Sequence, residues 1–430
     1  MTIIFQNQQS QPKQRIALIS VHGDPAIEIG KEEAGGQNVY VRQVGKALAE
    51  QGWQVDMFTR KVSPEQEDVV EHSPGCRTVR LAAGPVDFIP RDEIFDHAPE
   101  FVQQFLAFQS REAATYPLVH TNYWISSWVG MELKKHQPLV QVHTYHSLGA
   151  VKYRSVSQIP MIAATRLAVE KSCLESAERI VATSPQEKEH MRSLVSTQGA
   201  IDVIPCGTDV ERFGAISRQS ARTKLGIDPN KKVILYVGRF DPRKGIETLV
   251  RAVGQSSLRS SADLQLIIGG GSRPGQSDGI ERDRIEGIVA ELGLTEITEF
   301  PGRLADDALA IYYAAADVCV VPSHYEPFGL VAIEAMASQT PVVASDVGGL
   351  QFTVVPEETG LLAPPKDAAA FAAAIDRILA DPEWQQQLGQ AARTRMVDKF
   401  SWRGVAAQLS DLYTRLLTEQ PTAAPKELSA

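Results

Sequence analysis

The sequence predicts an α/β protein with two doubly wound parallel-sheet domains, and three observations support this prediction. The chain has 430 residues, more than a single hydrophobic core usually serves. Apolar strand-like segments alternate with amphipathic helix-like segments along most of the chain, a pattern typical of parallel sheets covered by helices. The breaker cluster PCGTD at residues 205–209 interrupts the alternation near the middle, so we expect a domain boundary there.

The first domain is predicted to span residues 15–206. Its first strand, 15–21, follows a polar, glutamine-rich stretch, and we expect residues 1–14 to form a flexible tail rather than a secretory signal or a membrane span. A helix with apolar side chains at helical spacing begins at Gly36. The other expected elements are strands at 53–58, 117–120, 139–143, 179–183 and 201–204, and helices around 101–108 and 161–177.

The second domain is predicted to span residues 207–400 and to repeat the same alternation. Its expected strands are 232–235, 264–268, 317–321 and 341–344. An amphipathic helix is expected over 402–417. The end from 419 to 430 is rich in Ala, Pro, Thr and Glu, a composition that predicts a second flexible tail.

Charge and cysteine content exclude several classes of function. Lys and Arg number 43 against 52 Asp and Glu, a net charge of −9, which disfavours binding to nucleic acid or to an anionic membrane. The four cysteines form no C-x-x-C pair, so neither a zinc site nor a disulfide framework is expected. Reduced, buried thiols in a cytoplasmic protein are the simplest interpretation.

The most informative motif is HYEPFGLVAIE, which carries Glu326 and Glu334 eight residues apart. It lies between an apolar strand and a helix, so one carboxylate is expected in the loop and the other on the first turns of the helix. Gly329 lies where backbone N–H groups can approach a ligand, and a helix start of this kind attracts phosphate. Carboxylates beside such a site suit sugar hydroxyls, and the motif therefore indicates a nucleotide-sugar.

A second motif, YVGRFDPRKG, follows the strand at 232–235 and supplies positive charge. Arg239 ends the strand and Lys244 enters the next helix. Ligands of open α/β sheets bind outside the carboxyl ends of the strands, so both cations are expected to converge on one diphosphate. Arg243 is interpreted as a plain surface charge. The sequence also lacks the Asp-x-Asp signature by which many nucleotide-sugar transferases hold a divalent ion, and we expect no metal or other cofactor.

Together these motifs resemble the retaining glycosyltransferases of the GT-B type, and within them the group of sucrose-phosphate synthase and sucrose synthase. The resemblance covers about residues 15 to 418. It implies two facing Rossmann-like domains, with residues 401–418 as a closing helix that returns to the first domain. It also implies domain closure about residues 205–208, a step that would exclude water from the donor.

The resemblance assigns roles to residues of the second domain. The position of Glu326 holds hydroxyls of the transferred sugar and that of Glu334 holds the ribose, while Gly329 and Leu330 offer N–H groups to the donor. Arg239 and Lys244 stabilise the departing UDP as fixed charges. With His146, the residues Arg239, Lys244 and Glu326 form the predicted catalytic set.

The first domain contributes the rest of the predicted site. His146 lies in an His-Ser-Leu-Gly motif that touches the donor sugar in the family, and Gly35-Gly36-Gln37 opens a helix that faces both sugars. Gly35 and Gly36 are assigned to the donor. Four residues are assigned to the phosphorylated acceptor: Gln37, Arg91, Lys152 and Arg166.

The expected reaction is transfer of glucose from UDP-glucose to fructose 6-phosphate with retained anomeric configuration, giving sucrose 6-phosphate. One departure leaves the acceptor open: Asp87-Phe88-Ile89 stands where the group often has Asp-Lys-Tyr. Residues 120–124 (HTNYW) also resemble inositol-phosphate glycosyltransferases of the mycothiol pathway. Free fructose, an ADP or GDP donor and a non-catalytic nucleotide-sugar-binding protein are alternatives, and the sequence leaves the oligomeric state open.

Overall fold

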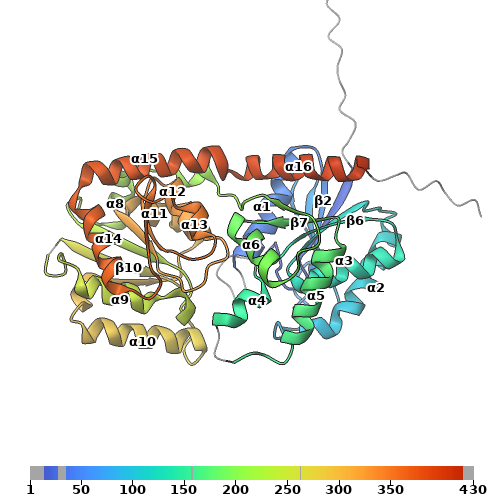
Figure 1. The fold of residues 1–430 in the computed structure, drawn as a ribbon, viewed down its shortest axis with the longest axis horizontal. Helices are drawn as coiled ribbons and strands as arrows, with labels where there is room; N and C mark the ends of the chain where they lie inside the picture. Colours follow the sequence, from blue (N-terminus) through green and yellow to red (C-terminus); the bar gives the residue numbers. More distant parts are fainter. Residues whose placement is uncertain (1–13, 28–34, 156–157, 262, 420–430) are drawn as a thin grey trace, which may run out of the picture.

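In a computed structural model, which describes residues 14–27, 35–155, 158–261 and 263–419, the chain forms two α/β domains side by side (Figure 1). The predicted tail 1–14 falls almost wholly outside the described residues, as does the tail from 420. The fold-class prediction of two parallel-sheet α/β domains is confirmed. No helix among the described residues has the length and apolar character needed to cross a bilayer.

The N-terminal sheet has eight strands in the order β3-β4-β2-β1-β5-β6-β7-β8. All neighbours pair in parallel except β3, which runs antiparallel to β4 at one edge. The order reverses between β1 and β5, so the crevice where ligands bind in such sheets opens at their carboxyl ends. The strands are β1 (Arg15–Ile19), β2 (Gln54–Arg60), β3 (Val69–Ser73), β4 (Cys76–Leu81), β5 (Leu118–Asn122), β6 (Val140–Thr144), β7 (Arg179–Ala182) and β8 (Ile201–Val203).

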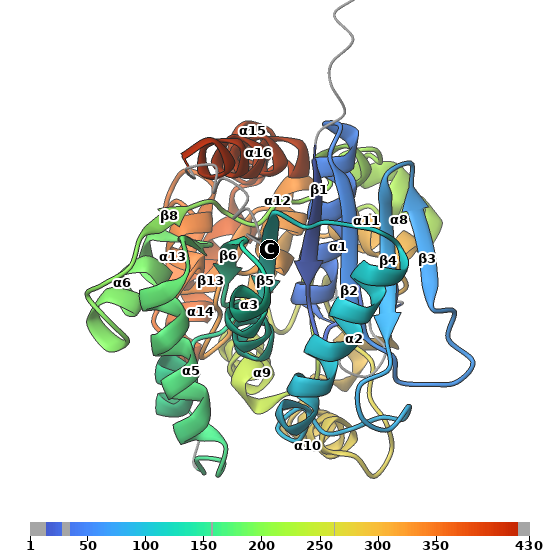
Figure 2. The same ribbon diagram turned by 90° about the vertical axis from the view of Figure 1, so that its right-hand side faces the viewer.

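Helices on both faces cover this sheet, and Figure 2 shows the domain from its outer end. Apolar side chains alternate along the strands, so Ile16 and Leu18 pack with α1 on one face while Ala17 and Ile19 pack with α2 and α3 on the other. The helices are α1 (Gly36–Glu50), α2 (Ala98–Arg111), α3 (Trp124–His136), α4 (Gly149–Lys152), α5 (Ala163–Ser176) and α6 (Pro185–Leu194).

The C-terminal sheet has six parallel strands in the order β11-β10-β9-β12-β13-β14. Its order reverses between β9 and β12, which places a second crevice at their carboxyl ends. The strands are β9 (Lys232–Val237), β10 (Leu264–Gly269), β11 (Thr298–Gly302), β12 (Val318–Val321), β13 (Val342–Ser345) and β14 (Gly360–Ala363). The helices are α7 (Val210–Phe213), α8 (Arg218–Leu225), α9 (Ile246–Gln255), α10 (Ser277–Glu291), α11 (Asp306–Ala315), α12 (Leu330–Ala337), α13 (Leu350–Thr353), α14 (Ala368–Ala380), α15 (Pro382–Lys399) and α16 (Trp402–Glu419).

The last helix, α16, returns to the N-terminal domain along the top of the molecule (Figure 1). Trp53 donates its indole N–H to Ser410 Oγ at 2.9 Å, and His120 Nδ1 lies 2.5 Å from the Tyr413 hydroxyl. At the crossover, the Thr208 N–H donates to the Phe400 carbonyl at 2.6 Å. The two segments that pass between the domains are therefore tied to each other.

Candidate functional site

The loop between β12 and α12 carries the acidic motif at the reversal point of the C-terminal sheet. Gly329 ends this loop with φ 96°, and a Cβ there would lie 2.6 Å from Leu350 Cδ2, so only glycine fits. The turn at Gly329 starts α12 and places Glu326 in the loop and Glu334 on the helix. The structure thus has one carboxylate of the motif in the loop and the other on the helix, as the sequence predicts.

Lys244 and Glu326 come together from loops that are 82 residues apart in the chain. Lys244 Nζ lies 2.6 Å from Glu326 Oε2, and their side chains are 28% and 13% exposed. Ser323 donates its hydroxyl to the same carboxylate oxygen at 3.3 Å. Arg239 lies on the loop after β9, is exposed, and has no ion-pair partner among the described residues. One free and one paired cation therefore stand at this crevice.

Glu334 faces a different group from Glu326. Its Oε2 accepts a hydrogen bond from the Tyr313 hydroxyl at 2.9 Å. Burial raises the pKa of Tyr313 well above its ordinary value, and the charge of Glu334 raises it further, so the phenol remains a donor. The two glutamates thus face separate groups, Glu326 from the loop before α12 and Glu334 from the helix itself.

The N-terminal domain meets this loop directly. A Cβ on Gly36 would lie 3.0 Å from Leu330 Cδ1, so the first turns of α1 and α12 touch. Gly35 precedes α1, and the Gln37 amide donates to Ser20 Oγ at 2.9 Å. The Tyr325 hydroxyl is hydrogen-bonded to the Ser147 side chain, and burial raises the pKa of Tyr325 to about 12. The predicted donor-binding segments of both domains therefore face each other.

His146 is held beside this contact in a left-handed backbone conformation, with φ 58°. Its Nε2 lies 2.9 Å from Asn122 Oδ1, and the Tyr40 ring packs against it at 4.8 Å. Burial, with a smaller effect of His120, lowers the pKa of His146 to about 3. The imidazole is neutral near pH 7, so it can act as a hydrogen-bonding group but not as a cation.

Cations gather around Tyr123 in the N-terminal domain. The guanidinium groups of Arg91 and Arg166 lie over its ring, with Cζ 5.9 Å and 5.0 Å from the centroid. Burial, together with the nearby charges of Arg166, Arg91 and Arg243, lowers the pKa of Lys152 to about 8. A site of such concentrated positive charge suits a phosphate.

Arg166 differs from the other two cations because its guanidinium is engaged within its own domain. The side chain is only 2% exposed, and its Nε lies 2.7 Å from Glu170 Oε1. Its Nη1 donates to the Tyr123 hydroxyl at 3.1 Å and its Nη2 to the Ser147 carbonyl at 2.6 Å. Its assignment to the acceptor stays a prediction, while the structure gives it a role in positioning Tyr123 and Ser147.

Two residues near the cations were not predicted as part of the site. Arg243, interpreted from the sequence as a surface charge, lies close enough to Lys152 to lower its pKa, although it belongs to the other domain. His22 packs on the Tyr123 ring at 4.4 Å, and its buried Nδ1 has no hydrogen-bond partner among the described residues. Its place directly after β1 is the sequence signal that could have identified it.

No group of three or more His, Cys, Asp and Glu side chains in the described part of the chain could hold a metal ion. All four cysteines are buried and unpaired. Activity without a metal stays a prediction, which rests on Arg239 and Lys244 as the cations available to a diphosphate.

Comparisons with known proteins agree with this geometry. The family model of glycosyl transferases group 1 matches residues 217–395 and that of glycosyltransferase family 4 matches residues 34–212. The chain belongs to the GT-B glycosyltransferases and is an enzyme of that class.

The relatives and solved structures that are similar to this chain carry the names of different glycosyltransferases. The chain is 54% identical to the solved sucrose-phosphate synthase from Thermosynechococcus elongatus, with TM-score 0.87, over 95% of this chain and 100% of that chain. It is 35% identical to D-inositol 3-phosphate glycosyltransferase of Corynebacterium glutamicum (strain R), over 94% of this chain and 98% of the relative. Anabaena HepE, solved with UDP and glucose, shares the fold at 20% identity and TM-score 0.72, over 94% and 100% of the two chains.

The Glu326 loop packs against Gly349, and substitution of this glycine tests the packing of the site. The Gly349 N–H donates to the Glu326 carbonyl at 3.1 Å, and a Cβ on Gly349 would lie 2.4 Å from Phe328 Cα. We expect Gly349→Ala to lower the free energy of unfolding by about 1–3 kcal/mol through overpacking. Gly287→Ala in α10, where a Cβ meets no atom within 4 Å, is the control and should be neutral or stabilising. Equal urea midpoints for wild type and Gly349→Ala would contradict this packing.

Proposed function

We propose that the protein transfers glucose from UDP-glucose to fructose 6-phosphate and forms sucrose 6-phosphate with retained anomeric configuration. The observation that supports this proposal is that the Lys244–Glu326 pair and the cations around Tyr123 belong to two domains that touch where Gly36 meets Leu330. One side suits a sugar diphosphate and the other suits a sugar phosphate. The 54% identity to a sucrose-phosphate synthase over nearly the whole chain supports the same reaction.

The donor side accounts for departure of UDP. The bond between the anomeric carbon and the diphosphate oxygen breaks while negative charge develops on that oxygen, and Arg239 and Lys244 stabilise this charge. The acceptor hydroxyl attacks from the face that UDP leaves and gives its proton to a donor phosphate oxygen. Glu326 is bound to Lys244 at 2.6 Å, which supports a role in positioning the sugar rather than in covalent attack. His146, neutral at this pH, would hydrogen-bond the donor sugar.

The acceptor side favours a phosphorylated sugar over a free one. Arg91 and Lys152 lie in one field of positive charge that also includes Arg243 from the other domain. Burial of a lysine among like charges is costly, and a bound dianion would relieve that cost. Free fructose carries no charge and offers no such gain.

An inositol phosphate is the second candidate acceptor, because relatives 35% identical along the chain carry the name D-inositol 3-phosphate glycosyltransferase. Fructose 6-phosphate and an inositol phosphate both carry a phosphate group, but one has a sugar ring and the other a cyclitol ring. Incubation of the protein with UDP-glucose and each acceptor in turn, including free fructose, with product mass as the readout, tests the proposal. Sucrose 6-phosphate as the main product is expected. Faster glycosylation of inositol phosphate would overturn the choice of acceptor, and UDP release with no acceptor would overturn the transfer.

Substitution of the two donor-side cations tests the mechanism. We expect Arg239→Ala and Lys244→Ala each to lower kcat by about 10²–10³, because each removes a preorganised charge from the leaving group. Lys224→Ala, an exposed lysine on α8, is the matched control and should retain turnover. Near-normal kcat in both site variants would rule this assignment out.

The pH dependence tests the role of Lys152. Its pKa of about 8 means that the cation is lost as pH rises through 8, while a phosphate monoester with second pKa of about 6 stays a dianion. We therefore expect kcat/KM for fructose 6-phosphate to fall between pH 7.5 and 9.5, since this parameter reports ionisation of the free enzyme. Lys152→Arg keeps its charge over this range and should shift the fall to higher pH. Superimposable profiles would remove Lys152 from the acceptor site.

A further inference from the structure

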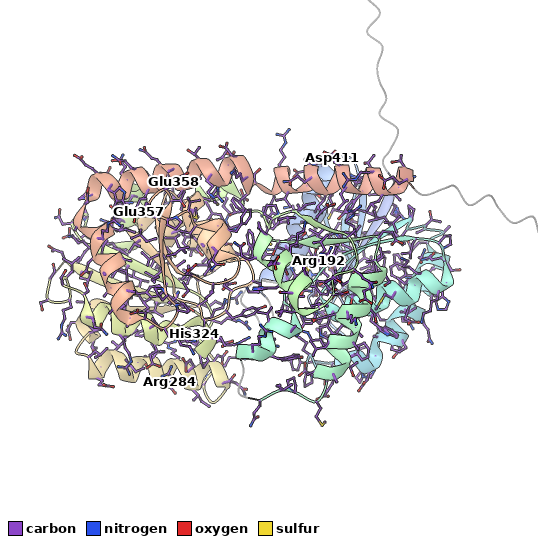
Figure 3. The ribbon with its side chains drawn as sticks, viewed as in Figure 1. Arg192, Arg284, His324, Glu357, Glu358 and Asp411 are labelled. Atoms are coloured by element: carbon purple, nitrogen blue, oxygen red, sulfur yellow. The ribbon has the colours of Figure 1, made fainter. Side chains whose placement is uncertain are left out.

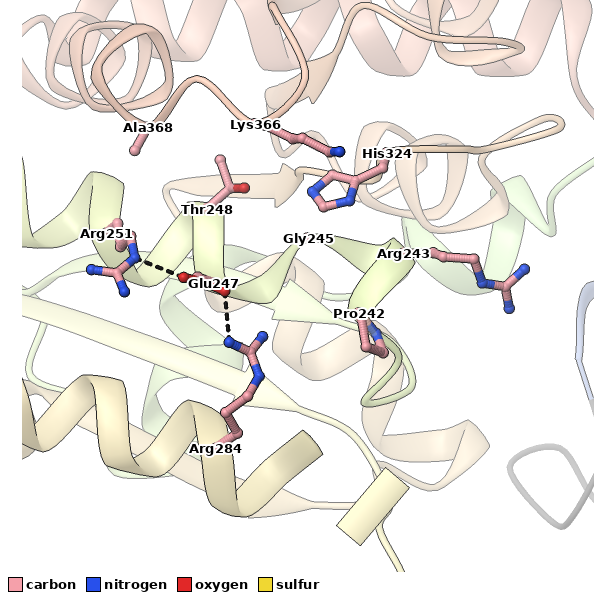
Figure 4. Close-up of a pocket in the computed structure, with 10 residues that line it drawn as sticks. All are labelled: Pro242, Arg243, Gly245, Glu247, Thr248, Arg251, Arg284, His324, Lys366 and Ala368. Carbon is pink, nitrogen blue, oxygen red and sulfur yellow. Dashed lines mark hydrogen bonds and ion pairs between the residues drawn. The ribbon is translucent and has the colours of Figure 1, made fainter. Parts of the chain in front are cut away.

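A separate pocket of about 380 Å³ lies on the C-terminal domain. Thr248 and Arg251 of α9, Arg284 of α10, His324 after β12 and Lys366 after β14 line it, together with Glu247. Figure 3 shows His324 and Arg284 at the lower part of this domain, and Figure 4 shows the lining side chains.

The pocket neighbours the Lys244–Glu326 pair and extends from it toward α9 and α14, on the other side of the C-terminal sheet from α12. Side chains of β9 alternate between the two faces: Val233 and Leu235 pack with α11 and α12, whereas Ile234 and Tyr236 pack with α9 and α14. The donor motif begins α12, and the pocket lies at the start of α9. Arg243 also lines the pocket, although Figure 4 shows its guanidinium directed away from the other lining side chains.

Two polar side chains that line the pocket have an atom without a hydrogen-bond partner among the described residues. Thr248 is only 6% exposed, and no hydrogen bond of its hydroxyl exists among the described residues. In Figure 4 that hydroxyl points to the side of the pocket where His324 and Lys366 lie. The buried Nε2 of His324 also has no hydrogen-bond partner in the described part of the chain. The Thr248 hydroxyl is open to the pocket and can donate to a ligand oxygen, whereas the His324 Nε2 atom is enclosed and faces Gly245.

The charge of the pocket indicates that this ligand is an anion. Glu247 is its acidic side chain, and it is already neutralised by Arg251 Nε at 2.8 Å and Arg284 Nη1 at 2.6 Å. Lys366 is exposed and has no ion pair among the described residues. The first turn of α9 adds N–H groups and the positive end of the helix dipole. Gly245, with φ 69°, packs against the Pro322 carbonyl, where a Cβ would lie 2.0 Å from the oxygen.

We propose that this pocket binds a phosphate dianion, either inorganic phosphate or the phosphate group of a small monoester. Lys366 Nζ, the Thr248 hydroxyl and the amides of the first α9 turn hold its oxygens. Arg251 and Arg284 lie around it, both bound to Glu247, and Arg284 is also bound to Glu281. Gly245 joins the pocket to Lys244, so the site is one residue away from the donor machinery in the chain.

Calorimetric titration of the full chain with inorganic phosphate, at fixed ionic strength and with excess UDP, tests the proposal. We expect saturable binding that weakens at least about tenfold in Thr248→Val and in Lys366→Gln, because each loses a hydrogen bond to a charged group. Lys399→Gln, which removes an exposed lysine at the end of α15, is the control and should bind as wild type. A second titration with glycerol 3-phosphate distinguishes free phosphate from a monoester.

Three outcomes would overturn the inference: no saturable binding of either compound, equal affinity in wild type and both pocket variants, or equal weakening in the Lys399→Gln control. Thr248→Val is nearly isosteric and Lys366 is exposed, so neither substitution should alter the fold, and unchanged melting temperatures check this. Titration of each variant with UDP alone measures the affinity of the donor site separately. Loss of phosphate binding with intact UDP binding is the expected pattern.

Discussion

The Lys244–Glu326 ion pair is the interaction on which the site depends. It joins the loops after β9 and β12, the two strands between which the order of the C-terminal sheet reverses. Glu326 is largely buried, so loss of Lys244 would leave a carboxylate that is desolvated and without its cation, a strongly destabilising change. The pair thereby fixes the loop before any ligand arrives. Such preorganisation is what allows fixed charges to stabilise a transition state without further rearrangement.

The relation between the two domains follows from their shared connections. The chain crosses between them near Thr208 and again near Phe400, and a 2.6 Å hydrogen bond joins these crossings. Helix α16 then anchors on the N-terminal domain through Trp53 and His120. The predicted domain closure would therefore rotate about one narrow region. On the opposite side, Gly36 meets Leu330 and Tyr325 meets Ser147, so such rotation would open or close the site directly.

The sequence was sufficient for most of the parallel strands and for the donor motifs, because apolar runs mark buried strands and parallel strands bring their carboxyl ends to one edge. That rule alone placed Lys244 near Glu326. The parallel edge strands β11 and β14 were not predicted. The rule also could not find β3 and β4, since Val69–Ser73 is a half-polar edge strand and lacks an apolar run. Nor could it predict that Arg166 is buried on Glu170 or that Arg243 acts across the domains, because both depend on tertiary neighbours.

The acceptor side shows how the chain compensates for a missing cation. Where the family often has lysine, this chain has Phe88, whose side chain is 49% exposed. Arg60 fixes the same loop by donating to the Pro85 and Asp87 carbonyls, each at 2.6 Å, so the loop itself is well held and only its charge is lost. In the proposed reaction, positive charge for the acceptor phosphate would then come from Arg91 and Lys152. Arg243 of the other domain lowers the pKa of Lys152 but is itself paired with Asp241, so its contribution to a bound phosphate would depend on the position of the two domains, a dependence that a lysine at position 88 would not require.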